Sequence, residues 1–404
     1  MNVPPLYLAD HRAGVLYRLH RNALTTVDAG VLSEHAGVAQ ASCELALWID
    51  EAAGEAVLDT PSGSTRISVA VPAEHVAVDP TGRLALVTPG LGLDLDPWNP
   101  VASFVDLESG VAARFRTRPG EPGAGWVRDA TTGEPVAVLR HREPGAIEAI
   151  GLDELLALGP HVPALSGQLC EELAPDGHGD VASGEVFATA TSRGLERFRV
   201  RHGRPEAAGI VRWPSPGRAH YLRLDPATGH ALGVLRSGPA DPQRWAEWNN
   251  AMAWIDLHSG RARSLELPPG LAFRFGLGGD TAAVATIHPD GDHLSVLRRD
   301  AGGWRLAETR ALPALSGSPR PGHVPWEGIA GAPAQRRSVA VSADGRWIAV
   351  TRGGDSQMHV LNAARHGSPL RAVAVPTSLD EGGIAFFRED TVGAAPAHAD
   401  GVGR

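Results

Sequence analysis

Short runs of apolar residues, broken at regular intervals by turn residues, dominate the chain. The runs are four to six residues long, and Gly, Pro, Asp and Asn separate them, as in VAVDPTGRLALV, WIDLHSGRARSLEL and VAVSADGRWIAV. Strands of this length joined by tight D-G, S-G or T-G turns are typical of antiparallel hairpins. No shift in composition divides the sequence, so the pattern predicts an all-β protein with a single domain over residues 1–404.

Two sequence elements recur along the chain. The first, a strand, a turn and a second strand, occurs at His75–Val87 and again at Ser338–Val350. The second is V/I-D-L-x-S-G followed by a strand, found at Phe104–Gly110 and at Trp254–Gly260. Together the two elements make a unit of four strands, and four strands in a repeat of roughly 40–50 residues indicate the blade of a β-propeller.

The repeat can be tiled along most of the chain. Its units are 75–117, 123–165, 166–214, 217–268, 270–313 and 336–383. The tail Ile384–Ala395 is expected to supply a strand pair to one more blade, which strands in the N-terminal LYLADHRAGVLYRLHR complete. Closing the ring with strands from both termini removes the last free sheet edge. This tiling favours a seven-bladed propeller of four-stranded antiparallel blades, or eight blades if residues 31–70 form their own.

The repeated units resemble those of a known group of proteins. VAVDPTGRLALVT and VAVSADGRWIAVT, each with a V/I-D-L-x-S-G strand, are similar to the bacterial YVTN or lactonase-like β-propellers. That superfamily also holds the amine-dehydrogenase heavy chains and the nitrous-oxide-reductase propeller. A weaker similarity links Cys170–Gly194 to periplasmic zinc-chaperone propellers, in which a Cys and a His-Gly precede an inner strand. The resemblance implies the propeller fold, and it implies metal carriage as one possible function.

Composition and charge exclude several classes of function. All 37 basic residues are arginine, which rules out a Schiff-base lysine, a P-loop lysine and a Ser–Lys nucleophile pair. A formal net charge of −9 argues against a nucleic-acid partner. No apolar run approaches the roughly 18 residues of a membrane span, and no signal-peptide pattern opens the chain. Cys43 and Cys170 are too few for a disulfide framework. We therefore expect a cytoplasmic protein without nucleic-acid or membrane partners.

The start of each inner strand is the expected place for chemistry, because these positions converge at one mouth of a propeller's channel. The candidates there are Glu74, His75, His178, His220, Tyr221 and Arg337. Three imidazoles and a carboxylate suit zinc or a similar divalent ion, so His75, His178 and His220 are candidate metal ligands, with Glu74 or Glu327 as a catalytic base. Alternatively, each histidine only caps its strand, and Tyr221 and Arg337 bind a small ligand.

Two further regions carry candidate ligand-binding residues. The loop GHVPWEG contains His323 and Trp326, and it is longer than a hairpin requires. Trp98 and Trp248 each precede an asparagine at matching positions of two repeats. The paired tryptophans predict either an aromatic wall for a ligand or a contact that locks one blade against the next.

Three functions fit these features. We favour a binding protein whose His/Arg-lined mouth recognises a small anionic molecule or a protein partner. The first alternative is a metal-dependent lactonase-like hydrolase or lyase at the same mouth, and the second is a metal-binding carrier. No G-x-S-x-G, H-E-x-x-H or Walker A motif is present, and the cofactor that a histidine-rich rim would suit is a divalent metal such as zinc.

Overall fold

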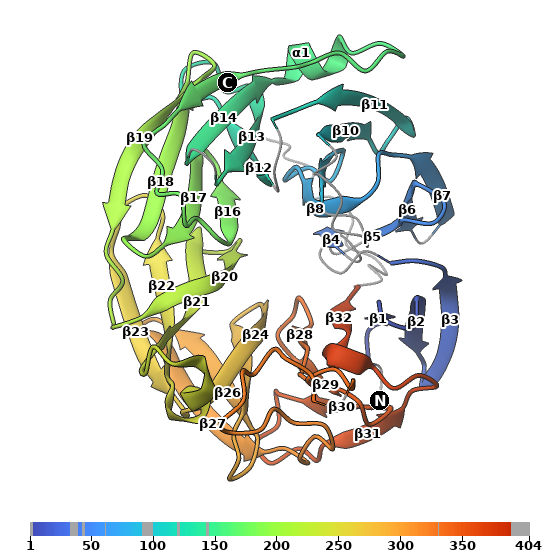
Figure 1. Ribbon diagram of the computed structural model, residues 1–404, viewed down its shortest axis with the longest axis vertical. Helices are drawn as coiled ribbons and strands as arrows, with labels where there is room; N and C mark the ends of the chain where they lie inside the picture. The colour runs from blue at the N-terminus through green and yellow to red at the C-terminus, as the bar shows by residue number, and fades with distance from the viewer. Residues whose placement is uncertain are drawn as a thin grey trace, which may run out of the picture.

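The molecule is a ring of β-sheets set around a common centre (Figure 1). The computed structural model describes residues 3–32, 39–42, 45–60, 62–90, 100–118, 122–142, 145–329 and 331–388. Within these residues the strands form eight four-stranded antiparallel sheets, each a propeller blade. The all-β prediction is therefore confirmed, and no helix among these residues is long and apolar enough to cross a membrane.

The first half of the chain contributes three complete blades and most of a fourth. Blade 1 contains β1 (Leu6–Asp10), β2 (Val15–His20), β3 (Ala23–Ala29) and, from the other end of the chain, β32 (Ile384–Phe387). Blade 2 contains β4 (Ala39–Ser42), β5 (Leu45–Asp50), β6 (Glu55–Thr60) and β7 (Gly63–Ser68). Blade 3 contains β8 (Ala73–Val78), β9 (Leu84–Pro89), β10 (Val101–Asp106) and β11 (Val111–Arg116). Blade 4 contains β12 (Gly123–Arg128), β13 (Pro135–His141), β14 (Ala146–Gly151) and β15 (Gln168–Cys170), with the short helix α1 (Leu152–Leu156) after β14.

The second half contributes the remaining four blades. Blade 5 contains β16 (Asp180–Ser183), β17 (Val186–Thr191), β18 (Gly194–Arg201) and β19 (Arg204–Val211). Blade 6 contains β20 (Arg218–Asp225), β21 (His230–Ser237), β22 (Asn249–Asp256) and β23 (Ala262–Leu267), with a 3-10 helix at Pro242–Glu247. Blade 7 contains β24 (Leu271–Gly278), β25 (Thr281–Ile287), β26 (His293–Asp300) and β27 (Gly303–Ala311). Blade 8 contains β28 (Val339–Val341), β29 (Trp347–Arg352), β30 (Gln357–Asn362) and β31 (Arg371–Ala374), and a 3-10 helix at Asp380–Gly382 precedes β32.

The favoured count of seven blades is wrong, and the alternative of eight is correct. Residues 39–68 form blade 2 instead of adding strands to a neighbour. Its turn sequence, WIDEAAG at Trp48–Gly54, is a further copy of the element seen at Trp254–Gly260. This copy joins the second and third strands of its blade, whereas the copy at Trp254–Gly260 joins the third and fourth. The motif therefore identifies a hairpin without identifying its position in the blade.

The physical role of that motif is to build a tight turn. Asp106 accepts hydrogen bonds from the backbone N–H groups of Glu108 and Ser109, and the N–H of Gly110 donates to the Asp106 carbonyl at 2.9 Å. Gly110 has φ +70°, a left-handed conformation that glycine adopts without steric cost. Asp256 and Gly260 repeat these bonds. In both copies the aspartate and the glycine four residues later thus hold the turn together.

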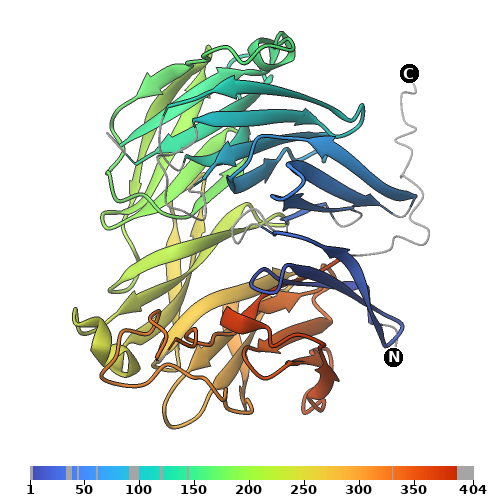
Figure 2. The same ribbon diagram turned by 45° about the vertical axis from the view of Figure 1, so that its right-hand side comes forward.

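Blade 1 closes the ring with strands from both termini, as the sequence predicts. β32 pairs antiparallel with β1 and is the innermost strand of that blade. Figure 2 shows β1–β3 lying between blade 2 and the C-terminal blade 8. The N-terminal region supplies three strands and the C-terminal region one, so β32 completes the sheet by itself. The rest of the expected C-terminal strand pair, residues 389–395, lies outside the described part of the chain.

Candidate functional site

The starts of three neighbouring inner strands bring aromatic and imidazole rings together at one mouth of the ring's centre. His178 lies two residues before the first residue of β16, and its N–H donates to the carbonyl of Ala190 at 2.8 Å, extending the β16–β17 pairing. His220 and Tyr221 lie on β20 of the next blade. The ring centroids of His178 and His220 are 5.8 Å apart, in an edge-to-face arrangement. The convergence expected for these two histidines therefore occurs.

A small cavity of about 110 Å³ opens beside the two histidines. Tyr221 contacts His178 at 6.0 Å and Phe273, on the inner strand of blade 7, at 5.2 Å between ring centroids. Trp326, from the loop before blade 8, is 50% exposed and completes the border. The full lining is His178, His220, Tyr221, Val234, Arg236, Ala272, Phe273, Phe275 and Trp326. A volume of this size admits a few water molecules or a small ion, at roughly 30 Å³ for each water.

Both histidines are neutral at physiological pH. Burial and, to a smaller extent, the nearby charges of Arg142 and Arg140 lower the pKa of His178 to about 4. Burial likewise lowers the pKa of His220 to about 3, together with the charges of Arg236 and Arg218. Arg142 Nη2 donates to His178 Nδ1 at 2.5 Å, and Arg236 Nη2 donates to His220 Nε2 at 3.3 Å. Because a guanidinium can only donate, each ring carries its proton on the other nitrogen.

Arg236 is the unusual cation of this cavity. Its guanidinium is half-buried, lines the cavity, and lies 4.3 Å over the ring of Trp248. Among the described residues, no carboxylate forms an ion pair with it. By contrast, the buried Arg140 is paired with Asp180 at 2.8 Å. Arg236 therefore presents a positive charge to the cavity without a counter-ion.

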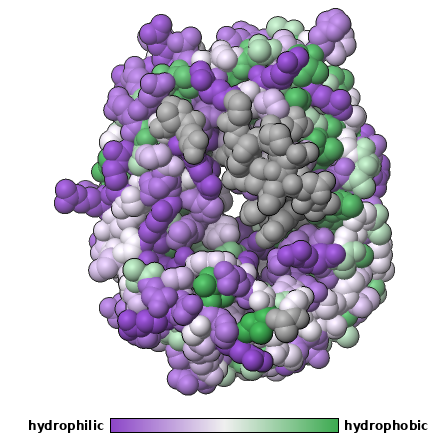
Figure 3. Space-filling model, viewed as in Figure 1, coloured by the Kyte–Doolittle hydropathy of each residue, from purple (hydrophilic) through white to green (hydrophobic). Residues whose placement is uncertain are grey.

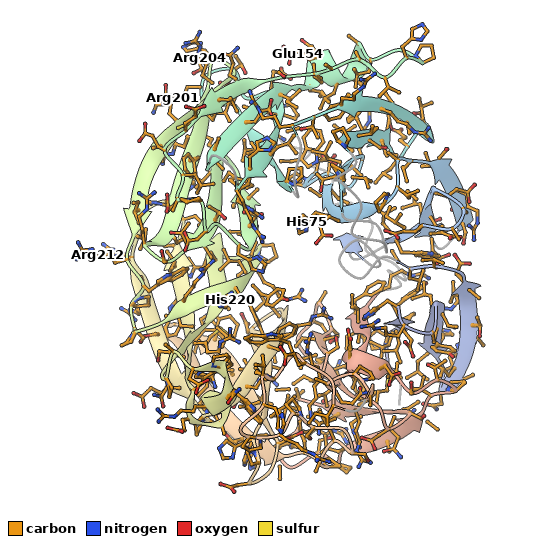
Figure 4. The ribbon with its side chains drawn as sticks, viewed as in Figure 1. His75, Glu154, Arg201, Arg204, Arg212 and His220 are labelled. Carbon is orange, nitrogen blue, oxygen red and sulfur yellow. The ribbon has the colours of Figure 1, made fainter. Side chains whose placement is uncertain are left out.

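The structure does not assemble the three-histidine metal site. Within the described ranges, no group of three or more His, Cys, Asp or Glu side chains is arranged to hold a metal ion. Figure 4 shows His75 and His220 at the inner edge of the ring, on strands of different blades, and neither His75 nor Glu74 lines the cavity. The ring nitrogens of His178 and His220 that carry a lone pair already accept hydrogen bonds from arginine. These residues do not fit a zinc site.

The other candidate residues fall at three different places. His323 and Glu327 are exposed in turns of the loop that carries Trp326, and of the three only Trp326 lines the cavity. Trp248 is buried, donates from Nε1 to the Pro239 carbonyl at 3.0 Å, and acts on the cavity through Arg236. Trp98 lies outside the described residues.

Arg337 lies away from the cavity. Its guanidinium is 2% exposed and donates to Asp292 of blade 7, with Nε 2.8 Å from the carboxylate, and to the carbonyl of Thr351 at 3.1 Å. The neighbouring Arg336 faces the mouth instead, 4.6 Å over the ring of Phe273. The structure thus gives Arg337 a contact between blades and places Arg336 at the mouth.

Sequence reasoning missed Arg236, Arg142 and Phe273. Arg142 and Arg236 belong to second strands or to the loops that follow them, whereas the expected site residues lie near the starts of inner strands, in the loop of Trp326 and beside the repeated asparagines. The hairpin of β20 and β21 gives a signal for Arg236, because residues that pair across a hairpin lie at the same distance from the turn. Arg236 pairs with Arg218, near the start of the inner strand β20.

Acidification is expected to destabilise the protein through the two buried imidazoles. The folded-state pKa values of about 4 and about 3 lie below the unfolded value of about 6.5, so the unfolded chain binds protons first as the pH falls. Stability is therefore full above pH ~6.5 and declines toward pH 4–3. We expect a loss on the order of 2 kcal/mol between pH 7 and pH 5, discounted because both rings are partly exposed.

Urea unfolding across this pH range measures the effect. The matched variant is His178→Asn/His220→Gln, which removes both titrating rings and keeps an oxygen acceptor for Arg142 and Arg236. Its stability is expected to vary less steeply with pH than that of the wild type. Parallel profiles for the two proteins would contradict the assignment.

Comparison with known proteins was made at the level of sequence and of structure. No protein-family profile and no curated protein sequence matches the chain. The crystal structure of AztD from Citrobacter koseri superposes with a TM-score of 0.62 at 15% identity, covering 95% of this chain and 98% of that one. Dihydro-heme d1 dehydrogenase NirN in complex with DHE gives 0.55 at 11% identity, over 93% of this chain and 74% of that one. A functionally unknown protein from Desulfotomaculum acetoxidans gives 0.51 at 9% identity, over 96% and 100%. These likenesses confirm the β-propeller fold.

Proposed function

We propose that the protein binds a small anion, a carboxylate or phosphate group, in the cavity beside His178, His220 and Arg236. The observation that carries this proposal is the half-buried Arg236 guanidinium, which lines the cavity and has no carboxylate partner among the described residues. A buried charge without a counter-ion is costly, and an anionic ligand would supply the missing partner. Hydrogen bonds from guanidinium to carboxylate or phosphate are among the strongest in proteins.

The surroundings of the cavity support an anion over a cation. Arg142 and Arg236 each donate to an imidazole at the border, and Arg336 lies over Phe273 on the same rim. Arginine suits this task because its planar group stacks on an aromatic ring while its N–H groups still point to a ligand. Figure 3 shows the hollow at the centre of the face seen in Figure 1, with hydrophilic residues along much of its border.

The Arg236→Gln variant tests this function. Calorimetric titration with inorganic phosphate is expected to show binding to the wild-type protein and an affinity lower by about tenfold or more in the variant, because a charged hydrogen-bond donor is lost. The matched control is Arg305→Gln, which removes an exposed arginine of β27 that pairs with Asp300. The control is expected to bind phosphate like the wild type. Equal affinities in all three proteins would contradict the proposal.

A metal-dependent hydrolase or lyase, and a metal carrier, are the rival functions that the sequence resemblance implies. Stoichiometric zinc in protein purified without a histidine tag, lost in the His75→Ala/His178→Ala variant, would favour these rivals. We expect instead that chelator leaves the melting temperature unchanged, because the donor set at the mouth does not fit zinc.

A further inference from the structure

Two further cavities follow the first along β20. A second cavity, of about 220 Å³, shares Tyr221 and Phe275 with the first and is also lined by Leu222, Arg223 and Arg274. A third, of about 630 Å³, shares Leu222 and Arg223 with the second and is also lined by Asp225. Successive residues of one inner strand therefore line a row of three neighbouring cavities, which we call the passage.

Arg223 projects into this passage. Protein groups surround it on the inner side of the ring, and its side chain is exposed to the solvent of the passage. Nε donates to the carbonyl of Phe275 at 2.8 Å, and the guanidinium carbon is 5.9 Å from the Phe275 ring. Among the described residues, no acceptor is bonded to either Nη nitrogen of Arg223. Both terminal NH2 groups, with four N–H donors between them, therefore remain for a ligand.

The charges around Arg223 are positive. Burial lowers the pKa of Arg223, and the guanidinium of Arg274 on β24 lowers it further. Arg274 lines the same cavity and donates from Nη1 to the Gly383 carbonyl at 3.1 Å. Two cations thus face one confined space, an arrangement that an anion would stabilise.

The carboxylates along the passage are already committed to other arginines. Asp225 pairs with Arg299 at 2.6 Å, and Asp180 pairs with Arg140 at 2.8 Å. Neither acid forms an ion pair with Arg223 in the part of the chain that the structure describes. The second cavity therefore resembles the first, since each holds an arginine without a carboxylate partner.

We propose that the ligand is an elongated dianion, with one anionic group at Arg236 and His220 and the other at Arg223 and Arg274. This inference rests on the proposed anion-binding function and narrows its ligand class. His220 and Arg223 are three residues apart on β20, so at about 3.3 Å per residue the two anionic groups lie roughly 7–10 Å apart. Tyr221 and Phe275, which line both cavities, favour an apolar or aromatic segment between the two charges.

A pair of eight-carbon acids tests the inference by calorimetric titration. Suberate carries a carboxylate at both ends and octanoate at one. The wild-type protein is expected to bind suberate about tenfold or more tightly than octanoate, because the second carboxylate gains a charged partner. The Arg223→Gln variant is expected to lower the affinity for suberate to that for octanoate, because the second carboxylate loses its charged partner. Arg305→Gln again serves as the control.

The outcomes separate this inference from the function on which it rests. If Arg236→Gln weakens phosphate binding but Arg223→Gln leaves suberate binding unchanged, the proposal of a dianionic ligand is wrong and the proposal of an anion site at Arg236 is supported. If wild-type protein binds phosphate but holds suberate no more tightly than octanoate, the dianion is overturned as well. If wild-type protein binds none of the three anions, both proposals fail. Melting temperatures of the two variants within a few degrees of wild type show that each is folded.

Discussion

The Asp59→Ala variant is expected to lose about 3–5 kcal/mol of unfolding free energy, because the buried Arg388 guanidinium is left without its carboxylate partner. Asp59 of blade 2 accepts a hydrogen bond from Arg388 Nη1 at 2.9 Å, directly after the closing strand β32. The hydroxyl of Tyr7 on β1 donates to the same oxygen. All three residues are at most 6% exposed. One carboxylate therefore ties both ends of the chain to blade 2.

The surroundings of Tyr7 agree with this interpretation. Burial and the hydrogen bond to Asp59 together raise the pKa of Tyr7 to about 12, so the phenol stays protonated and keeps donating. The Arg388 guanidinium lies 5.4 Å from the Tyr7 ring centre, and Tyr7 stacks on Phe386 at 5.0 Å. The charge pair and the aromatic stack occupy the same junction between the termini.

Urea unfolding of three variants separates the charge from the packing. Asp300→Ala, which removes one partner of the exposed pair with Arg305, is expected to cost less than about 1 kcal/mol. The double variant Asp59→Leu/Arg388→Met is expected to recover part of the Asp59→Ala loss, because apolar groups of similar volume replace both charges. Equal losses in Asp59→Ala and Asp300→Ala would contradict a closing role for the buried pair.

The second large effect concerns Arg337 and Asp292, which join blade 8 to blade 7. Both side chains are 2% exposed, and two guanidinium nitrogens, Nε and Nη2, lie 2.8 and 2.7 Å from one Asp292 oxygen. Asp292 also accepts from the N–H of His288 at 3.2 Å. Replacing Asp292 with alanine leaves Arg337 buried and unpaired, so we expect a loss of about 3–5 kcal/mol.

The same variant decides whether Arg337 binds ligand. We expect the Asp292→Ala protein to bind phosphate with wild-type affinity at a temperature at which both proteins are folded, because Arg337 does not line the cavity. If the Asp292→Ala protein kept its stability and lost phosphate binding, Arg337 would instead be a ligand-binding residue.

The sequence predicts the fold well because turns and strands are local. A strand is recognised from its own alternating residues, and many of the tight turns from an aspartate and a glycine four residues on, as at Asp106 and Gly110. The number of blades depends on which hairpin of a blade each turn closes. That position follows from long-range pairing, and the turn at Asp50–Gly54 gives no local sign of it.

The site is predicted only in part because its members come together through packing between blades. His178 and His220 were expected there because they lie near the starts of inner strands. Arg336 and Arg337 are neighbours in the segment that precedes β28, and their side chains point in different directions. Arg336 stacks on Phe273 at the mouth, while Arg337 lies between blades. Only the packing of the blades in space distinguishes the two.

The closing strand β32 is synthesised long after β1, the strand with which it pairs. β1 begins at residue 6 and its inner partner β32 at residue 384, so at about 5–20 residues per second β1 waits roughly 20–75 s on the ribosome for that partner. Throughout this interval β1 exposes an unpaired edge, which is the part of a sheet most prone to pair with other chains. Slower translation lengthens that exposure. A ribosome that stops between β31 and β32 releases a ring that is complete in seven blades and open in the eighth.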